Sequence, residues 1–494
     1  MKISLVPRAA PSDRIRIWVG ILAPHVPTLV WHLDGDLVTD ARIRPLRPLA
    51  SAIPANLLDA LPADNYAGVF EISGLHPGTL YEVSLSANTP NATASAELRT
   101  KTLPSSVPNL LDSTFNVLLA SCFYRGEDKT GQVGVVTSQL NGATRPDLTL
   151  LLGDQVYLDL PTLVNFPDNR AALARRFEGD YRANWQGETG YSQLLRVAPT
   201  ASIPDDHEYW NNFPHPSPVV QNSWTQSGRD NWTEAAAALH QAFQFSYEPA
   251  TYHHGGPAEL GDASVINVEP LSFFMADGRS KRDPDRAAVL TARAREQLDH
   301  WVSDTINRRR IGVFTTGQSM LGVAVGGLKG KIADYQMANY GDFSYITNTL
   351  GRLAEAGLPV IMITGDVHWG RVAAARDART GRESLFEIIC SPTSLVSTVG
   401  KNQLLALQQA ITGHADAWPR HASAEPVPEF LWFGNFGSRF VCSRVHEQRG
   451  NHFVLLSFTR SGAGVNLRTT YYPIHEDFNQ RRPQAVREIS LIPA

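Results

Sequence analysis

Four short, nearly continuous apolar runs set the strongest constraint on the fold of this 494-residue chain. Such runs are typical of strands that are buried on both faces of a sheet. Stretches of helical character lie between them, and alternating strands and helices indicate an α/β domain. The runs are Val117–Ala120, Leu148–Leu152, Ile311–Phe314 and Val360–Ile363, and the expected helices span 170–185, 231–246, 286–308 and 345–357.

The segment before these runs has a different character. Residues 1–104 alternate polar and apolar side chains between turn residues, which predicts β-strands. Within it, Ile72–Val83 resembles the tyrosine corner of fibronectin type III and immunoglobulin-like sandwiches, in which the hydroxyl of Tyr81 would bind backbone. Proline and serine at 104–113 read as a linker. We therefore expect a fibronectin type III-like β-sandwich over 1–104 and a separate α/β domain over 113–494.

Composition bounds the partners and the compartment. A net charge of −4 gives no general attraction to nucleic acids or anionic membranes, so no specific nucleic-acid partner is expected. Three cysteines do not make a disulfide framework, and at least one is free or has a chemical task. No apolar run is long enough to span a bilayer, and the first residues lack the positive stretch and apolar core expected of a secretory signal. These features predict a cytoplasmic protein or a mature exported form.

Two of the apolar runs lead into side chains that can bind metal ions. Cys122 follows the first run, and its thiolate could bind iron or zinc; the alternative is a small buried core residue. Gly153 allows a sharp turn after the second run, so that Asp154 could bridge two hard cations; the alternative is a helix cap. Tyr157, three residues further on, could reach the same metal as a phenolate.

Two further segments carry the same kind of side chain. The run Asp205–Glu208 would be costly to bury unless cations offset its charge, and a solvated acidic turn fits poorly with the proline and aromatic residues around it. Asp366 and His368 follow the last apolar run and are two residues apart, so both would point to one side of an extended strand end. Together they predict half of a transition-metal site.

The four segments together resemble the metallophosphoesterase superfamily and, within it, the PhoD-type alkaline phosphatases. That variant is marked by Ser-Cys, Gly-Asp-x-x-Tyr, Asp-Asp-His-Glu and a late Asp-x-His. The matching segments here are Ser121–Cys122, Gly153–Tyr157, Asp205–Glu208 and Gly365–His368, and Phe274–Arg279 resembles the family's Asp-x-Arg segment. The resemblance implies an αββα sandwich whose loops hold the metals, preceded by a β domain.

The resemblance also implies the metals and their ligands. It suggests Fe³⁺ with Ca²⁺ alongside, while the residues themselves leave Zn²⁺ and Mn²⁺ open. Carried over, Cys122 and Tyr157 would hold the iron, and Asp154 would bridge it to the calcium. The remaining implied ligands are Asp206, with Asn212 as a second candidate at that metal, and Asp366 and His368.

The implied activity is hydrolysis of a small phosphate ester by a metal-bound hydroxide. His207 would stabilise the transition state or protonate the leaving oxygen, and Glu208 or Asp205 would orient it. Arg279 would clamp a phosphoryl oxygen; the alternative is a surface salt bridge.

Two other functions use the same residues. One is a phosphodiesterase specific for a nucleotide or a phospholipid. The other is a non-catalytic, metal-stabilised binding protein in which the N-terminal β domain recognises a partner. Ligand-type side chains in all four segments argue against the second.

Overall fold

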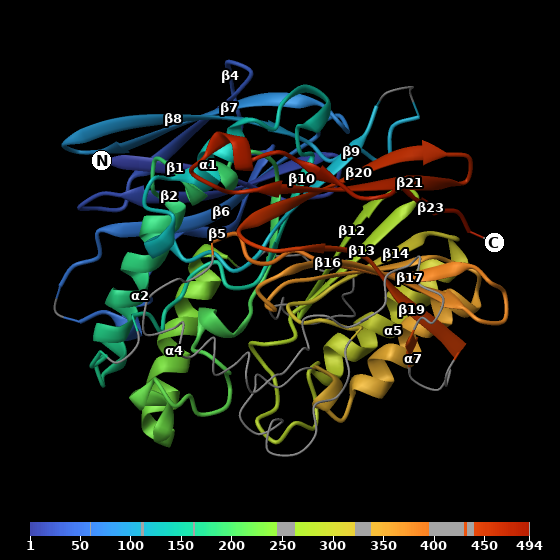
Figure 1. The fold of residues 1–494 in the computed structure, drawn as a ribbon. Coiled ribbons are helices and arrows are strands. Elements are labelled where there is room, and N and C mark those ends of the chain that lie inside the picture. The colour runs from blue at the N-terminus through green and yellow to red at the C-terminus, as the bar shows by residue number, and fades with distance from the viewer. Residues whose placement is uncertain are drawn as a thin grey trace.

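The computed structural model describes residues 1–59, 61–109, 113–161, 164–244, 262–321, 337–394, 429–431 and 439–493. Within these ranges the strands form three sheets (Figure 1). The largest has the order β22-β21-β20-β9-β10-β11-β1-β2-β6-β5, with β23 beside β21. Its strands are β1 (Lys2–Arg8), β2 (Arg14–Leu22), β5 (Ile43–Ser51), β6 (Asn65–Ser73), β9 (Phe115–Ala120), β10 (Leu148–Leu152), β11 (Thr200–Ile203), β20 (His452–Ser461), β21 (Gly464–Pro473), β22 (Gln484–Ala485) and β23 (Ile489–Leu491).

The other two sheets are smaller. The eight-stranded sheet has the order β12-β13-β14-β15-β17-β16-β19-β18, and the four-stranded sheet the order β4-β3-β7-β8. The eight strands are β12 (Ala263–Val268), β13 (Leu271–Ala276), β14 (Ile311–Thr315), β15 (Val360–Thr364), β16 (Gly370–Asp377), β17 (Glu383–Ile389), β18 (Glu429–Leu431) and β19 (Phe440–Gln448). The four are β3 (Thr28–Leu33), β4 (Asp36–Leu37), β7 (Leu80–Thr89) and β8 (Ala92–Lys101).

Four of the described helices fall close to the predicted ranges, and two shorter helices were not predicted. The predicted helices are α2 (Arg170–Trp185), α4 (Gln226–Phe243), α5 (Ala292–Asn307) and α7 (Phe343–Glu355), and the shorter ones are α1 (Gln132–Ser138) and α3 (Tyr191–Leu194). Two starts differ from prediction because threonine side chains cap them. Thr225 accepts a bond from the Gly228 amide, so α4 begins before 231. Thr291 accepts one from the Ala294 amide, so α5 begins after 286. No helix in the described ranges is both long and apolar enough to cross a bilayer.

The two larger sheets pack face to face, and helices cover their outer faces (Figure 1). Successive side chains of β10 show this: Leu150 and Leu152 point into the core between the sheets, and Leu151 points to the helices. In β15, Ile361 lies in the same inter-sheet core, and Met362 contacts the α5 and α7 layer. Burial on both faces explains the continuous apolar runs. The predicted α/β class is confirmed.

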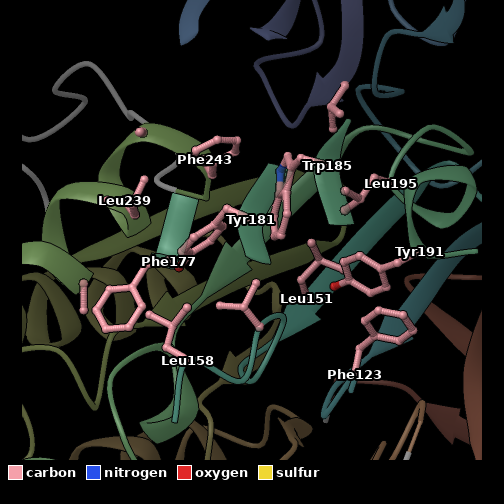
Figure 2. Close-up of a cluster of buried hydrophobic side chains, with 14 of the residues drawn as sticks. Phe123, Leu151, Leu158, Phe177, Tyr181, Trp185, Tyr191, Leu195, Leu239 and Phe243 are labelled. Atoms are coloured by element: carbon pink, nitrogen blue, oxygen red, sulfur yellow. The ribbon is translucent and has the colours of Figure 1, made fainter. Parts of the chain in front are cut away.

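Aromatic side chains fill the core under α2 and α4 (Figure 2). Phe243 stacks on Tyr181 with ring centroids 5.1 Å apart. The cluster closes over Leu151 of β10, which is fully buried. The labelled members are Phe123, Leu151, Leu158, Phe177, Tyr181, Trp185, Tyr191, Leu195, Leu239 and Phe243.

Replacement of Leu151 by alanine is expected to lower the free energy of unfolding by about 2–5 kcal/mol, because it opens a cavity under α2 and α4. Urea unfolding followed by tryptophan fluorescence measures this loss. Leu61→Ala is the matched control, since Leu61 is 60% exposed and its truncation leaves no cavity. Equal losses in the two variants would contradict the expectation.

The N-terminal strands form two facing sheets, β1-β2-β6-β5 and β4-β3-β7-β8, around one shared core. The Tyr81 hydroxyl accepts a 2.9 Å bond from the His76 amide, which confirms the predicted tyrosine–backbone bond. The fibronectin type III-like identity and a boundary at 104–113 stay predictions. Strand β1 also pairs in parallel with β11 through Arg8 and Thr200, so the sheet continues across that predicted boundary.

Candidate metal centre

The four predicted segments meet at the carboxyl ends of parallel strands. Cys122 follows β9, Asp154 follows β10, and Asp206 follows β11, three neighbouring parallel strands of the largest sheet. Asp366 follows β15 of the facing sheet. Since carboxyl ends of parallel strands share one edge, segments far apart in the sequence converge there.

The predicted ligands have unusual backbone conformations. Eight non-glycine residues in the described ranges have positive φ, and five of these are predicted metal ligands. Such conformations cost free energy and concentrate at functional sites. The five are Cys122 (φ 56°), Asp154 (φ 56°), Asn212 (φ 69°), Asp366 (φ 62°) and His368 (φ 59°).

Two glycines let the loops approach one another. A Cβ on Gly153 would lie 2.4 Å from Cβ of Asp205. A Cβ on Gly365 would lie 2.3 Å from Oγ of Ser121 and 2.6 Å from the carbonyl oxygen of Leu152. The Gly-Asp pairs therefore serve packing between loops as well as the turn itself.

The side chains of Cys122 and Tyr157 converge on one carboxylate oxygen of Asp154. Oδ2 of Asp154 lies 3.4 Å from Sγ of Cys122 and 3.5 Å from the hydroxyl of Tyr157. Ser391 donates to the same sulfur at 3.1 Å and accepts from the His368 amide at 3.0 Å, which links the late motif to the first.

All three of these groups are buried in a negative environment. Burial raises the pKa of Asp154 well above its usual value, and the charges of Asp206 and Asp205 raise it further. Burial raises the pKa of Cys122 and Tyr157 in the same way, with added repulsion from Asp154. A bound cation would offset this negative charge and favour the ionised forms of all three groups.

Five side chains, four carboxylates and the His207 imidazole, form two overlapping groups of three, and within each group the potential ligand atoms lie within 4.8 Å of one another. One group is Asp154, Asp206 and His207; the other is Asp205, Asp206 and Asp366. Oδ1 of Asp206 and Oδ1 of Asn212 are buried without a hydrogen-bond partner. Buried oxygens of this kind are the donors that hard cations prefer, so the residues fit a metal centre.

The ring of His207 is fixed on two sides. Its Nδ1 lies 2.8 Å from Oδ1 of Asp159, and it stacks on Tyr157 with ring centroids 4.1 Å apart. A carboxylate only accepts, so Nδ1 carries the proton and Nε2 is the nitrogen for proton transfer or cation binding. Asp159 is held in turn by the Asn211 amide at 3.0 Å.

Glu208, predicted to orient His207, lies elsewhere, and the orienting carboxylate is Asp159. Glu208 is fully buried and accepts bonds from the backbone amides of Asp154 (2.9 Å), Gln155 (2.6 Å) and Asp205 (2.8 Å). Burial raises its pKa to about 7 although these bonds oppose the shift. Glu208 thus joins the loops after β10 and β11. Sequence reasoning missed this role because it depends on backbone donors rather than on a motif.

Arg279 is a buried member of the site, so the surface salt-bridge alternative is wrong. Its Nε pairs with Oδ1 of Asp205, its Nη1 donates to the Phe213 carbonyl at 3.1 Å, and its Nη2 lies 4.0 Å from Oδ2 of Asp366. Asp205 was predicted as the alternative residue that orients His207, but its carboxylate pairs with Arg279 and it is Asp159 that holds the His207 ring. The guanidinium therefore connects loops of the two facing sheets.

Two residues of the site were not predicted. Asp159 lies two residues beyond Tyr157, and a second acid in that loop was the only sequence signal for it. Gln318 follows β14 and donates to Oδ2 of Asp366 at 3.2 Å. Its place after a continuous apolar run was the available signal, although the run is followed by no charged residue.

Comparison with solved structures identifies the fold. No protein-family model and no curated protein matches the sequence. A structure of PhoD aligns with 99% of this chain and 92% of its own length, with a TM-score of 0.61 and 14% identity. The chain has the fold of PhoD. The purple acid phosphatase PPD1 from yellow lupin (Lupinus luteus) aligns with 98% of this chain and 74% of its own, with a TM-score of 0.56 and 11% identity. The resemblance to PhoD in the four motifs thus extends to the whole fold.

Proposed function

We propose that the chain is a metal-dependent phosphoesterase of the PhoD type that hydrolyses small phosphate esters. The observation that carries the proposal is the pair of overlapping groups of potential metal ligands, Asp154, Asp206 and His207 in one and Asp205, Asp206 and Asp366 in the other. They lie beside the thiol and phenol at Asp154, on the loops of a PhoD fold. A phosphodiesterase specific for a nucleotide or a phospholipid is the alternative on the same residues, because phosphate monoesters and diesters share the reacting phosphoryl group.

The donor set supports two different cations. Cys122 and Tyr157 offer a thiolate and a phenolate, which suit ferric iron. Asp206 and Asn212 offer carboxylate and amide oxygens, which suit calcium. Asp154 would serve both through its two oxygens, and the remaining ligands would be Asp366 and His368. Zinc or manganese would fit many of the same donors.

Bound cations would supply the acidity that ionises a water molecule and the charge that neutralises phosphoryl oxygens. The chain's own residues do the rest. His207, held at Nδ1 by Asp159, presents Nε2 for proton transfer to the leaving oxygen or for a bond to the phosphoryl group. Arg279 is the candidate for contact with a phosphoryl oxygen. Its guanidinium also fixes the positions of Asp205 and Asp366 relative to each other.

The direct test is elemental analysis of the purified protein, combined with turnover of p-nitrophenyl phosphate and bis(p-nitrophenyl) phosphate before and after chelation. Bound metal and chelator-sensitive turnover are expected. A folded protein that binds metal but shows no turnover would favour the non-catalytic, metal-stabilised binding protein. The ratio of the two rates distinguishes monoesterase from diesterase.

If Tyr157 binds ferric iron, the protein is expected to be coloured, because phenolate-to-iron charge transfer absorbs visible light. Tyr157→Phe should bleach or shift the band. Tyr124→Phe is the matched control, since the Tyr124 ring lies 5.7 Å from that of Tyr157 but belongs to no ligand motif. An active, colourless protein that contains only zinc would contradict the assignment of iron.

A further inference from the structure

The carboxyl end of α4 is capped by side chains from the N-terminal strands. The last backbone bond of the helix runs from the Gln244 amide to the His240 carbonyl at 2.8 Å. The next carbonyls have no partner within the helix, as at any helix end. Donors from β5, β2 and β1 bind them one after another. Arg47 donates to Gln241 (2.6 Å), Trp18 to Ala242 (2.7 Å), and Arg8 to Phe243 and to Gln244 (3.1 Å).

Arg8 is buried against this helix end. Its side chain is 2% exposed, and in the described ranges its guanidinium pairs with no carboxylate. Burial lowers its pKa to about 9. The carboxyl end of a helix carries a partial negative charge, which favours a cation at this position. Arg8 is therefore placed to hold the end of α4.

The residue at that end continues the connection to the metal centre. Gln244 donates from Nε2 to Oε1 of Glu208 at 2.9 Å, while Ser202 donates to its carbonyl at 2.6 Å. Glu208 in turn accepts from the amides of Asp154, Gln155 and Asp205. Three hydrogen-bonded steps thus join Arg8 of β1 to the backbone of Asp154.

We propose that the N-terminal strands position the metal centre through the end of α4, with Arg8, Trp18 and Gln244 as positioning residues. The proposal rests on the proposed function, since it concerns the same metal ligands. Residues beyond the direct ligands affect metal affinity when they fix ligand geometry. On this account the N-terminal unit is part of the enzyme's active structure and not a passenger domain.

Trp18→Phe tests the contact between the N-terminal strands and the end of α4, because it keeps a ring in the core but removes the donor to Ala242. Trp31→Phe is the matched control: Trp31 is 5% exposed in the same N-terminal unit and lies in a core cluster separate from α4. Metal that remains bound during incubation with EDTA is measured by elemental analysis, well below the melting temperature of each variant. Trp18→Phe is expected to speed metal release, and Trp31→Phe to leave the rate unchanged.

Gln244→Met tests the contact between the end of α4 and Glu208, because methionine keeps the length of the side chain and removes the donor to Glu208. Metal release is expected to be about 10-fold faster. Arg8→Lys, which retains a cation at the helix end, should release metal more slowly than Arg8→Met. If Arg8→Met does not fold, Trp18→Phe and Gln244→Met still decide the question.

The outcomes separate this inference from the proposed function. A wild-type protein that binds no metal and hydrolyses no aryl phosphate would overturn both. A wild-type enzyme that does both, with Trp18→Phe and Gln244→Met releasing metal at its rate, would overturn only the positioning role. Equal acceleration by Trp31→Phe would also overturn it, since the effect would then be general destabilisation.

Discussion

Replacement of Asp154 by asparagine is expected to remove nearly all phosphoesterase activity while the fold is kept. Its Oδ2 contacts the Cys122 thiol and the Tyr157 hydroxyl, and its Oδ1 accepts from the His207 amide at 3.2 Å. An amide supplies one acceptor oxygen and no charge, so it cannot serve both sides. Loss of outer partners of metal ligands costs about 10–100-fold, and loss of this residue should exceed about 100-fold. Turnover of an aryl phosphate and metal content measure the effect.

Asp147→Asn is the matched control for that experiment. Asp147 lies just before the first residue of β10, at the end of the strand opposite to Asp154. It binds Lys101 at 2.7 Å and the Asn116 amide at 3.0 Å. The same change of charge at the amino end of the strand should leave metal content and turnover close to wild type. Wild-type activity and metal content in Asp154→Asn would show that Asp154 does not bridge the metals.

The sequence predicts the site well where its residues follow buried strands. Continuous apolar runs identify β9, β10 and β15, and the carboxyl ends of the parallel neighbours β9 and β10 lie at one edge of their sheet. Cys122 and Asp154 could therefore be placed together without coordinates, whereas Asp366 follows a strand of the facing sheet and was joined to them only by the family resemblance. The same pattern also predicts that β10 is buried on both faces, because Thr149 is the one polar residue in Leu148–Leu152.

The contacts that cross between elements could not be predicted. Glu208 binds backbone amides, which every residue except proline carries, so the residue types around Glu208 do not reveal its partners. Alternation in Arg14–Ile17 indicates a strand but does not reveal that β1, its neighbour, pairs with β11. The capping of α4 by Arg8 likewise joins residues more than two hundred positions apart. The independent β domain expected from the pattern therefore shares a sheet with the rest of the chain.

His207→Ala is expected to keep its metals and lose about 10²–10⁴-fold in kcat, the usual cost of removing a general acid. The reason is geometric: Asp159 fixes the proton on Nδ1, so Nε2 is the atom that can act on the leaving oxygen. The loss should be largest for alkyl phosphates, whose alkoxide needs a proton. It should be smaller for p-nitrophenyl phosphate, whose phenolate leaves unaided. Rates across a series of leaving groups, with metal content determined for each preparation, measure both effects.

The same series distinguishes the three roles open to His207. A steeper dependence on leaving-group pKa with full metal content identifies a proton donor. An equal loss for all leaving groups identifies a residue that binds the phosphoryl oxygens. Loss of metal together with activity identifies a ligand, which its place in one group with Asp154 and Asp206 permits. Asp159→Asn sharpens the distinction, because it removes the charge that stabilises a protonated ring and leaves Nε2 present. A proton donor should then become more acidic and lose activity at high pH first, whereas a metal ligand should hold its cation less tightly at every pH.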